Sequence, residues 1–245
     1  NASATGMLLN QKGIKNLYIL SLNYAAGKQV VGGIERTYKG KVVGKDFVPL
    51  SHKDWSAELA KIKAAKPDAV VAFYPGAWGP KFFTQYNQAG LNKTTPLYHV
   101  FSIDMGNLPI FQKIGLNVLN TFQTAQWSPD FKNAANQKFV SDFKKKYGVM
   151  PNHFAAQSYE TIMLIKSGVD AVGGDISKMD QMRAALEKAN FAAVRGNFKY
   201  GKEHFPIQDF HAREVVKGAD GKWTLEQRGL VVSNSRAYNY QDCKR

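Results

Sequence analysis

The sequence contains one cysteine, Cys243, among 245 residues. A single cysteine cannot form a disulfide within this chain. Two interpretations of Cys243 therefore stay open. It is a free thiol near the carboxyl terminus, or it is half of a bridge to a segment that this sequence does not contain.

Long apolar runs are also missing. No window approaches the roughly 20 consecutive apolar residues that a membrane-spanning helix needs. The first residues, NASATGMLLNQKG, lack the charged start and the long apolar stretch of a signal peptide. Because the chain begins at Asn rather than Met, we expect a processed or cut chain.

Acidic residues are scarce: 19 Asp and Glu stand against 33 Lys and Arg, which leaves a formal net charge of +14. A basic stripe would indicate nucleic-acid binding. The lysines, however, are scattered singly along predicted helix faces, and the densest run is Lys144–Lys146. This pattern is typical of solvated helix faces, so we expect no nucleic-acid partner.

Sequence signatures of catalysis and of cofactor binding are absent as well. The chain has no G-x-S-x-G, no phosphate-binding loop and no G-x-G-x-x-G. Its five His residues lack the spacing of metal ligands. We therefore predict a protein that is not an enzyme and that has no catalytic residues, no metal and no cofactor.

The sequence does contain 44% hydrophobic residues and a regular alternation of predicted strands and helices from Lys15 to about residue 126. Such alternation indicates an α/β fold with a mainly parallel sheet and right-handed crossovers. The predicted strands are Asn16–Leu22, Lys41–Val48, Ala69–Tyr74, Pro96–Phe101 and Asn120–Ala125. Helices are predicted over Ala26–Thr37, over about Trp55–Ala65 and over about Phe82–Ala89.

After Trp127–Asp130 the pattern changes. Three helices are predicted, over Phe131–Tyr147, His153–Val172 and Ile176–Ala189, the last with Ser177 as its N-cap. Strands follow at Phe198–Tyr200, Phe210–Lys217 and Lys222–Val231, the last two as a hairpin. Helices and a hairpin alone make a poor domain. The sequence therefore predicts two parts, residues 1–126 and residues 127–245, of which the second lacks its first half.

Candidate ligand contacts lie where the first predicted strand ends. The stretch KNLYILSLNYAAGK (Lys15–Lys28) places Asn23, Tyr24 and Ala25 between a buried strand and a helix. In open α/β sheets, ligands bind at the carboxyl edge of the strands. Tyr24 offers apolar area plus a hydroxyl, which suits a ligand with a hydrophobic body. The alternative for Tyr24 is ordinary packing at the sheet edge.

Four runs of sequence carry a resemblance that covers nearly the whole chain: Leu20–Gln29, Pro67–Leu91, Phe143–Ile162 and Gly196–Trp223. Together they resemble the periplasmic solute-binding proteins of the branched-chain amino-acid type. The resemblance implies the type I fold, in which two Rossmann-like lobes close on a small molecule that is then delivered to an ABC importer.

The resemblance also implies how the two lobes are divided. Residues 1–126 would form lobe II. Residues 127–245 would supply a crossing segment, helices and a hairpin that return to lobe I, with the final residues crossing back towards lobe II. The chain starts about where the family first enters lobe II. We therefore expect lobe I to be incomplete, with roughly a hundred or more residues upstream, including the groups that hold a ligand carboxylate.

Further site residues are carried over from the resemblance. Tyr24 matches an aromatic residue that lies over the ligand. A second aromatic contact falls near Tyr74, Pro75 and Gly76, with Pro75 at the gapless match and Phe73 interpreted as core.

After the fourth strand, where Ser102 is a further candidate, amino-acid binders carry an acidic residue because a ligand ammonium needs a counter-charge. Ile103 stands at the acidic position, one residue before Asp104. Asp104 would either substitute as the counter-charge or cap the following helix.

These observations favour the solute-binding component of an ABC importer that captures a small hydrophobic or aromatic carboxylate by closure of its two lobes. The alternative is a binder of branched-chain or hydrophobic amino acids, with Asp104 as the ammonium counter-charge. A ligand-sensing regulator or an enzyme on the same fold is less favoured. The expected partners are the small-molecule ligand and the membrane subunits of the transporter. We expect a periplasmic, exported protein that is a monomer when complete.

Overall fold

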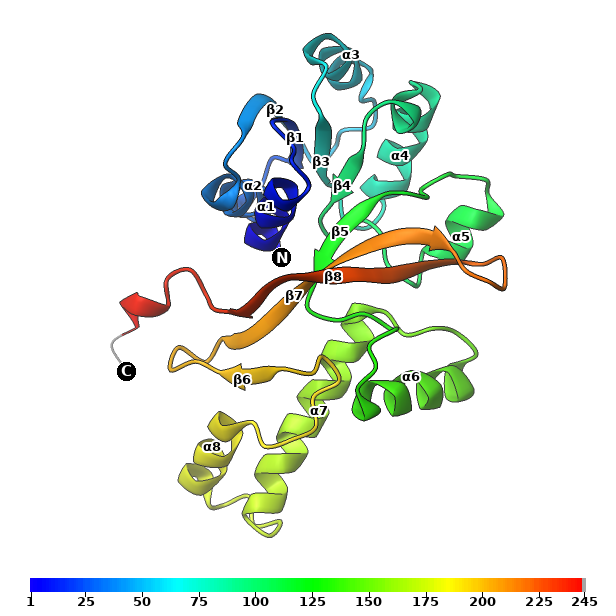
Figure 1. Cartoon of the computed structure of the whole chain (residues 1–245). Coiled ribbons are helices and arrows are strands. Elements are labelled where there is room, and N and C mark those ends of the chain that lie inside the picture. The colour runs from blue at the N-terminus through cyan, green and yellow to red at the C-terminus, as the bar shows by residue number, and fades with distance from the viewer. Residues whose placement is uncertain (244–245) are drawn as a thin grey trace. The chain divides into compact units, whose positions relative to one another are not determined.

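The computed structural model describes residues 1–243, which form two compact units (Figure 1). Unit 1 comprises Asn1–Ala125 and His211–Val231, and unit 2 comprises Gln126–Phe210 and the described residues from Val232 onward. Within residues 1–243, no helix has the length and apolar character needed to span a membrane.

Unit 1 is built on a sheet whose strands follow the order β2-β1-β3-β4-β5-β7. Strands β1 to β5 are paired in parallel, β7 is antiparallel to β5, and β8 pairs with β7. The strands are β1 (Asn16–Leu22), β2 (Lys41–Val48), β3 (Ala69–Phe73), β4 (Leu97–His99), β5 (Phe122–Ala125), β7 (Pro206–Lys217) and β8 (Trp223–Ser235). Strands β7 and β8 each have residues in both units.

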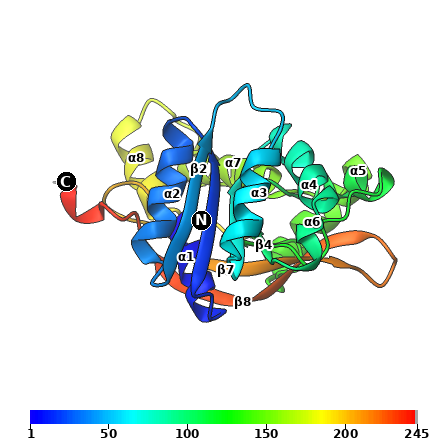
Figure 2. The same cartoon turned by 90° about the horizontal axis from the view of Figure 1, so that it is seen from above.

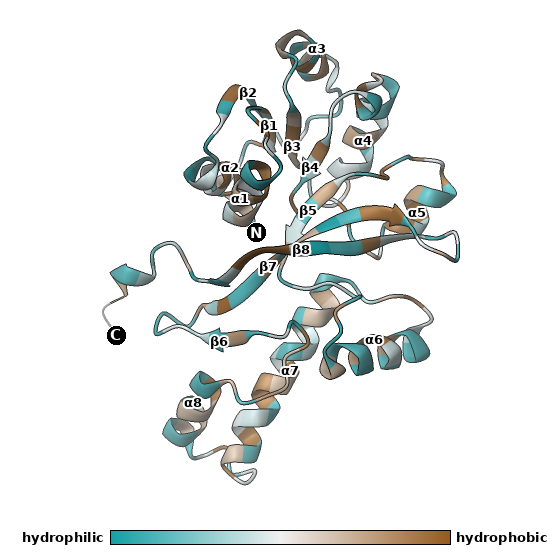
Figure 3. Cartoon of the chain, viewed as in Figure 1, coloured by the Kyte–Doolittle hydropathy of each residue, from teal (hydrophilic) through white to brown (hydrophobic). Residues whose placement is uncertain are grey.

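The central strands of unit 1 are buried on both faces. All five residues of β3 are buried, and β1 is buried from Leu17 to Leu22. Continuous apolar runs of this kind are typical of parallel strands that helices cover on both sides. Figure 2 shows α2 on one side of β2 and α3 on the other, and in Figure 3 the core strand β3 is coloured as hydrophobic. The helices are α1 (Ala2–Gln11), α2 (Ala25–Thr37), α3 (Ser56–Ala65), α4 (Trp78–Gln88) and α5 (Leu108–Lys113), with a 3-10 turn at Leu91–Lys93.

Helix α1 is an element that the sequence did not predict. It packs closely on α2. A Cβ atom added to Gly6 would lie only 2.3 Å from the Thr37 hydroxyl oxygen, so this close approach requires glycine. Its small and polar residues give a weak apolar pattern, although Leu8 and Leu9 are buried. The packing of one helix against another therefore stabilises a segment whose own periodicity is poor.

Several predicted boundaries are confirmed, since β1 and β2 have the expected ends. Strand β3 stops at Phe73, one residue before the predicted end, and β4 stops at His99 instead of continuing to Phe101. Strands β7 and β8 are longer than predicted.

Unit 2 consists of three helices and the strand β6 (Phe198–Tyr200), which is antiparallel to the beginning of β7. The helices are α6 (Ala134–Tyr147), α7 (His153–Ala171) and α8 (Met179–Lys188), and a 3-10 turn lies at Tyr240–Asp242. The side chains of Asn133 and Asn152 cap α6 and α7 by accepting backbone hydrogen bonds. The prediction of Ser177 as the N-cap of α8 was wrong, because Lys178 takes that position and Ser177 donates to Asp175.

The C-terminal hairpin differs from the expected division of the chain. We expected it to belong with the helices after residue 127, but from His211 onward β7 pairs with β5 of unit 1, with Gln123 opposite Arg213. A strand can pair with any sheet edge whose backbone N–H and C=O groups are unpaired. The local sequence of the hairpin does not determine which edge that is. The assignment of the two units to lobes stays a prediction.

Candidate ligand-binding site

The strand order of unit 1 reverses direction between β1 and β3. Helix α2 connects β1 to β2 on one side, whereas α4 connects β3 to β4 on the other. In doubly wound sheets of this order, ligands bind in the crevice outside the carboxyl ends of the two strands at that switch point. The residues at these ends are Asn23 and Tyr24 after β1, and Phe73 and Tyr74 at β3.

Two aromatic rings meet at the switch point. The rings of Tyr24 and Phe73 are stacked, with centroids 6.2 Å apart and planes inclined by 12°. Tyr24 is half-buried and Phe73 is buried, while Asn23 and Ala25 are exposed. Tyr24, the half-buried member of the pair, offers apolar area and one polar group, its hydroxyl, at this edge, and Phe73 supports its ring from the core.

A glycine sets the position of Tyr24 at the start of α2. A Cβ atom on Gly27 would lie 1.9 Å from the carbonyl oxygen of Leu22, so only glycine lets the helix begin directly against the end of β1. Tyr24 is the extended N-cap residue of α2, and its backbone N–H donates to the Leu22 carbonyl at 3.0 Å. The backbone on both sides of Tyr24 is therefore held in place.

Tyr74 lies in the core instead of at the ligand edge where the sequence placed it. Its side chain is fully buried, and its ring packs on Trp55 and Phe82 with centroids 5.3 Å and 4.8 Å away. Burial raises the pKa of the Tyr74 phenol above its ordinary value.

Phe73 was interpreted as core, and its burial confirms this; its ring also contacts that of Tyr24. Two residues further on, Pro75 is half-buried, and the exposed Gly76 takes a positive φ of 65° in the turn towards α4.

Ser102, a further predicted contact, is buried between the ends of two strands. It is 1% exposed, and its hydroxyl accepts from the Tyr74 backbone N–H at 3.1 Å and donates to the Val100 carbonyl at 3.3 Å. The hydroxyl therefore joins the ends of β3 and β4, and a ligand contact of Ser102 stays a prediction.

Asp104 uses one carboxylate oxygen to build the turn before α5. Its Oδ1 accepts from the backbone N–H of Gly106 at 2.6 Å and from that of Asn107 at 3.2 Å. The Asn107 side chain in turn accepts from the Asp104 N–H at 2.9 Å. Asp104 thus holds the turn that precedes α5, whose N-cap residue is Asn107, so the capping alternative was wrong in its exact position. Ile103, at the position of the acidic residue, is fully buried.

A buried polar group behind the candidate edge was not identified from the sequence. His99, in β4, is fully buried, and burial together with the positive charge of Arg213 lowers the pKa of His99 to about 3. Arg213 is also buried and donates to Gln123 at 2.9 Å, which donates to the Ile103 carbonyl at 3.1 Å. His99 is therefore a neutral core residue.

Residues 1–243 contain no group of three or more His, Cys, Asp or Glu side chains that could hold a metal ion. The dispersed His residues of the sequence therefore stay dispersed in the part of the chain that the structure describes.

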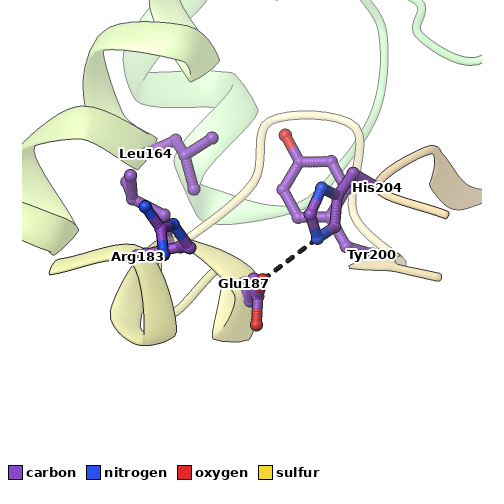
Figure 4. Close-up of a pocket in the computed structure, with 6 residues that line it drawn as sticks. Leu164, Arg183, Glu187, Tyr200 and His204 are labelled. Atoms are coloured by element: carbon purple, nitrogen blue, oxygen red, sulfur yellow. Dashed lines mark hydrogen bonds and ion pairs between the residues drawn. The ribbon is translucent and has the colours of Figure 1, made fainter. Parts of the chain in front are cut away.

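Unit 2 has a hollow of about 640 Å³ between α7, α8 and β6 (Figure 4). Leu164, Leu186 and Tyr200 give it apolar walls. Its charged groups pair with neighbours: His204 contacts Glu187 at 3.0 Å, and Arg183 contacts Asp180 at 3.1 Å. The hollow contains none of the predicted ligand contacts, so the carboxyl edge of unit 1 stays the candidate site.

Comparison with known proteins decides the family. The sequence profile of the family described as periplasmic binding protein matches residues 1–222. The chain belongs to this family. The type I fold that the sequence predicted is confirmed.

Solved structures and curated relatives of this periplasmic binding protein are similar over nearly all of its length. A solute-binding protein of an ABC transporter from R. palustris, solved in complex with benzoate, is 33% identical with a TM-score of 0.85. That comparison covers 97% of this chain and 64% of the other. The Leu/Ile/Val-binding protein homolog 6 of Brucella abortus is 26% identical over 236 residues, which is 89% of this chain and 59% of the relative.

More distant structures share the fold. A solute-binding protein from Rhodopseudomonas palustris BisB5 in complex with 3,4-dihydroxybenzoic acid has a TM-score of 0.82 at 24% identity, over 96% of this chain and 65% of that one. The chain thus spans about three fifths of the length of the relatives that it matches.

Proposed function

We propose that this chain belongs to the solute-binding component of an ABC importer and that it captures a small aromatic carboxylate. The observation that carries the proposal is the stacked pair Tyr24 and Phe73 at the switch point of unit 1. A flat apolar ligand body packs well on such rings, and aromatic pairs add to the free energy that burial alone supplies.

The residues at the position of the acidic counter-charge favour a ligand without an amine. A buried ammonium needs a carboxylate partner. Ile103 is apolar and fully buried. The Oδ1 atom of Asp104 already accepts hydrogen bonds from two backbone N–H groups. The benzoate that is named for the R. palustris relative supports the same ligand class.

Binding of a branched-chain or hydrophobic amino acid is the second candidate. It is supported by the Leu/Ile/Val-binding homologue from Brucella and by the half-buried Asp104, whose second carboxylate oxygen would pair with an ammonium. Under this alternative, replacing Asp104 by Ala abolishes leucine binding.

The mechanism is closure of two lobes on the ligand. Contacts made to both lobes stabilise the closed state and so increase its population. By the resemblance, groups outside this edge hold the ligand carboxylate. The protein is exported to the periplasm and delivers its ligand to the membrane subunits of the importer. It releases that ligand unchanged, as a binding protein and not an enzyme.

Calorimetry of the purified protein with benzoate and with leucine tests the proposal. We expect benzoate to bind and Tyr24→Ala to weaken its binding by about tenfold, because an aromatic contact and its buried area are lost. Tyr147→Ala, which removes a 56% exposed ring in unit 2, is the matched control and leaves the affinity unchanged. Tight leucine binding that is lost in Asp104→Ala, with no binding of benzoate, contradicts the proposal.

A further inference from the structure

A third aromatic side chain, Phe101, follows β4 at the same edge of unit 1. Strand β4 is parallel to β3, and the Val100 N–H continues this pairing by donating to the Ala72 carbonyl at 3.1 Å. Of the four residues that follow β4, Val100, Ser102 and Ile103 are buried, whereas Phe101 is half-buried. The apolar surface that this stretch presents therefore comes from Phe101.

The backbone of Phe101 has a conformation that a phenylalanine rarely adopts. Its φ is 55°, in the left-handed region that favours glycine. Strain of this kind persists only where the surrounding structure enforces it, and it is concentrated at functional sites. The sequence does not predict this backbone conformation, because the run from Pro96 to Phe101 has the pattern of an ordinary buried strand.

Hydrogen bonds on the C-terminal side of Phe101 enforce this conformation. The Ser102 hydroxyl is held by the Tyr74 N–H and the Val100 carbonyl, and the Asn107 side chain donates to the Ser102 carbonyl at 3.3 Å. The same Asn107 side chain accepts from the Asp104 N–H. Residues 102–107 thus form a turn held by side-chain hydrogen bonds, which fixes the backbone that follows Phe101.

We propose that Phe101 is a further ligand contact and determines specificity for flat aromatic carboxylates. This inference rests on the proposed function, since it assigns a role in the same site. Strands β1, β3 and β4 each supply one ring at their carboxyl ends, from Tyr24, Phe73 and Phe101. A backbone that is held in one conformation needs no reordering when the ligand binds, so little backbone entropy is lost.

The test compares two carboxylates of similar size, benzoate and cyclohexanecarboxylate. Only the first is flat and aromatic, and the ratio of their affinities reports on contacts with aromatic rings. In Phe101→Leu, which keeps the apolar character, we expect this ratio to fall by about three- to tenfold. In Phe101→Gly, which relieves the backbone, we expect weaker benzoate binding together with an unchanged or higher Tm.

Asn120→Gly is the matched control for backbone relief. Asn120 also has a positive φ, of 62°, but it precedes β5 and so lies at the opposite end of the strands. We expect it to leave the affinity ratio unchanged. If Phe101→Leu and Phe101→Gly bind both acids as the unmodified protein does, the role of Phe101 is refuted while the proposed function stands. If the unmodified protein binds neither acid, the proposed function itself fails, and this inference fails with it.

Discussion

Unit 1 and unit 2 bury their apolar residues to different degrees. In unit 1 every residue of β3 is buried within a helix-covered sheet. In unit 2 the long helix α7 leaves Phe154, Ile162 and Ile165 exposed by 54%, 63% and 45%, and brown residues recur along it in Figure 3. Unit 1 is therefore stabilised by a closed core. Unit 2 depends more on a small cluster around Trp127 and Phe139 and on individual polar contacts.

The comparison implies that the most damaging change in unit 2 is the loss of a buried ion pair. Arg195 and Glu160 form a salt bridge with side chains that are 9% and 4% exposed, and Glu160 also accepts from the Arg195 N–H at 3.1 Å. We expect Glu160→Ala to destabilise unit 2 by about 3–5 kcal/mol, because it leaves a buried guanidinium without its carboxylate.

Hydrogen exchange resolved by peptide measures this loss separately for each unit. The control is Asp170→Ala, which removes an exposed i,i+4 pair with Lys166 and costs less than about 0.5 kcal/mol. Equal protection of α7 in the two variants would show that the buried pair contributes no more than a surface pair.

One substitution made in both units tests the comparison directly. Leu20 in β1 is fully buried, whereas Leu164 in α7 is half-buried. We expect Leu20→Ala to lower the free energy of unfolding of unit 1 by about 2–5 kcal/mol, through lost burial and a cavity. Leu164→Ala should cost unit 2 about 1 kcal/mol or less. Urea denaturation of each variant measures the difference, and similar costs at both sites would remove the distinction between the two cores.

The smallest expected effect is a pH dependence of the stability of unit 1. The pKa of His99 is lowered to about 3 in the folded chain, whereas an unfolded His titrates near 6.5. Between these values the unfolded state binds more protons, so stability is fully present above pH 6.5 and is lost as the pH falls. At pH 5 the loss is about 2 kcal/mol relative to pH 7.

His99→Leu should reduce the loss of stability between pH 7 and pH 5. The control is His204→Leu, at an exposed His in unit 2, which should leave that loss unchanged. Denaturation between pH 7 and pH 5 makes the comparison. An unchanged slope in His99→Leu would assign the pH dependence to other groups.

The candidate ligand edge of unit 1 could be predicted in part. Tyr24 was placed correctly at the end of β1, because an apolar run followed by small residues and Gly27 is a local signal of a strand and a helix start. Phe73 and Tyr74 were harder to distinguish. Successive side chains of a strand point to opposite faces. Both residues are buried, and only the tertiary structure shows that Phe73 lies against Tyr24 whereas Tyr74 lies against Trp55 and Phe82.

By itself, the sequence determined the α/β class, the extents of β1 and β2 and the family, because all of these follow from local periodicity and from the order of segments. The tertiary structure decided which aromatic ring lies against Tyr24, that Ser102 and Asp104 support the turn, and that the hairpin joins β5. It also decided the left-handed backbone of Phe101. The physical reason is the same in each case: the deciding contacts come from residues on other strands or further along a turn, and their geometry is fixed only when the chain has folded.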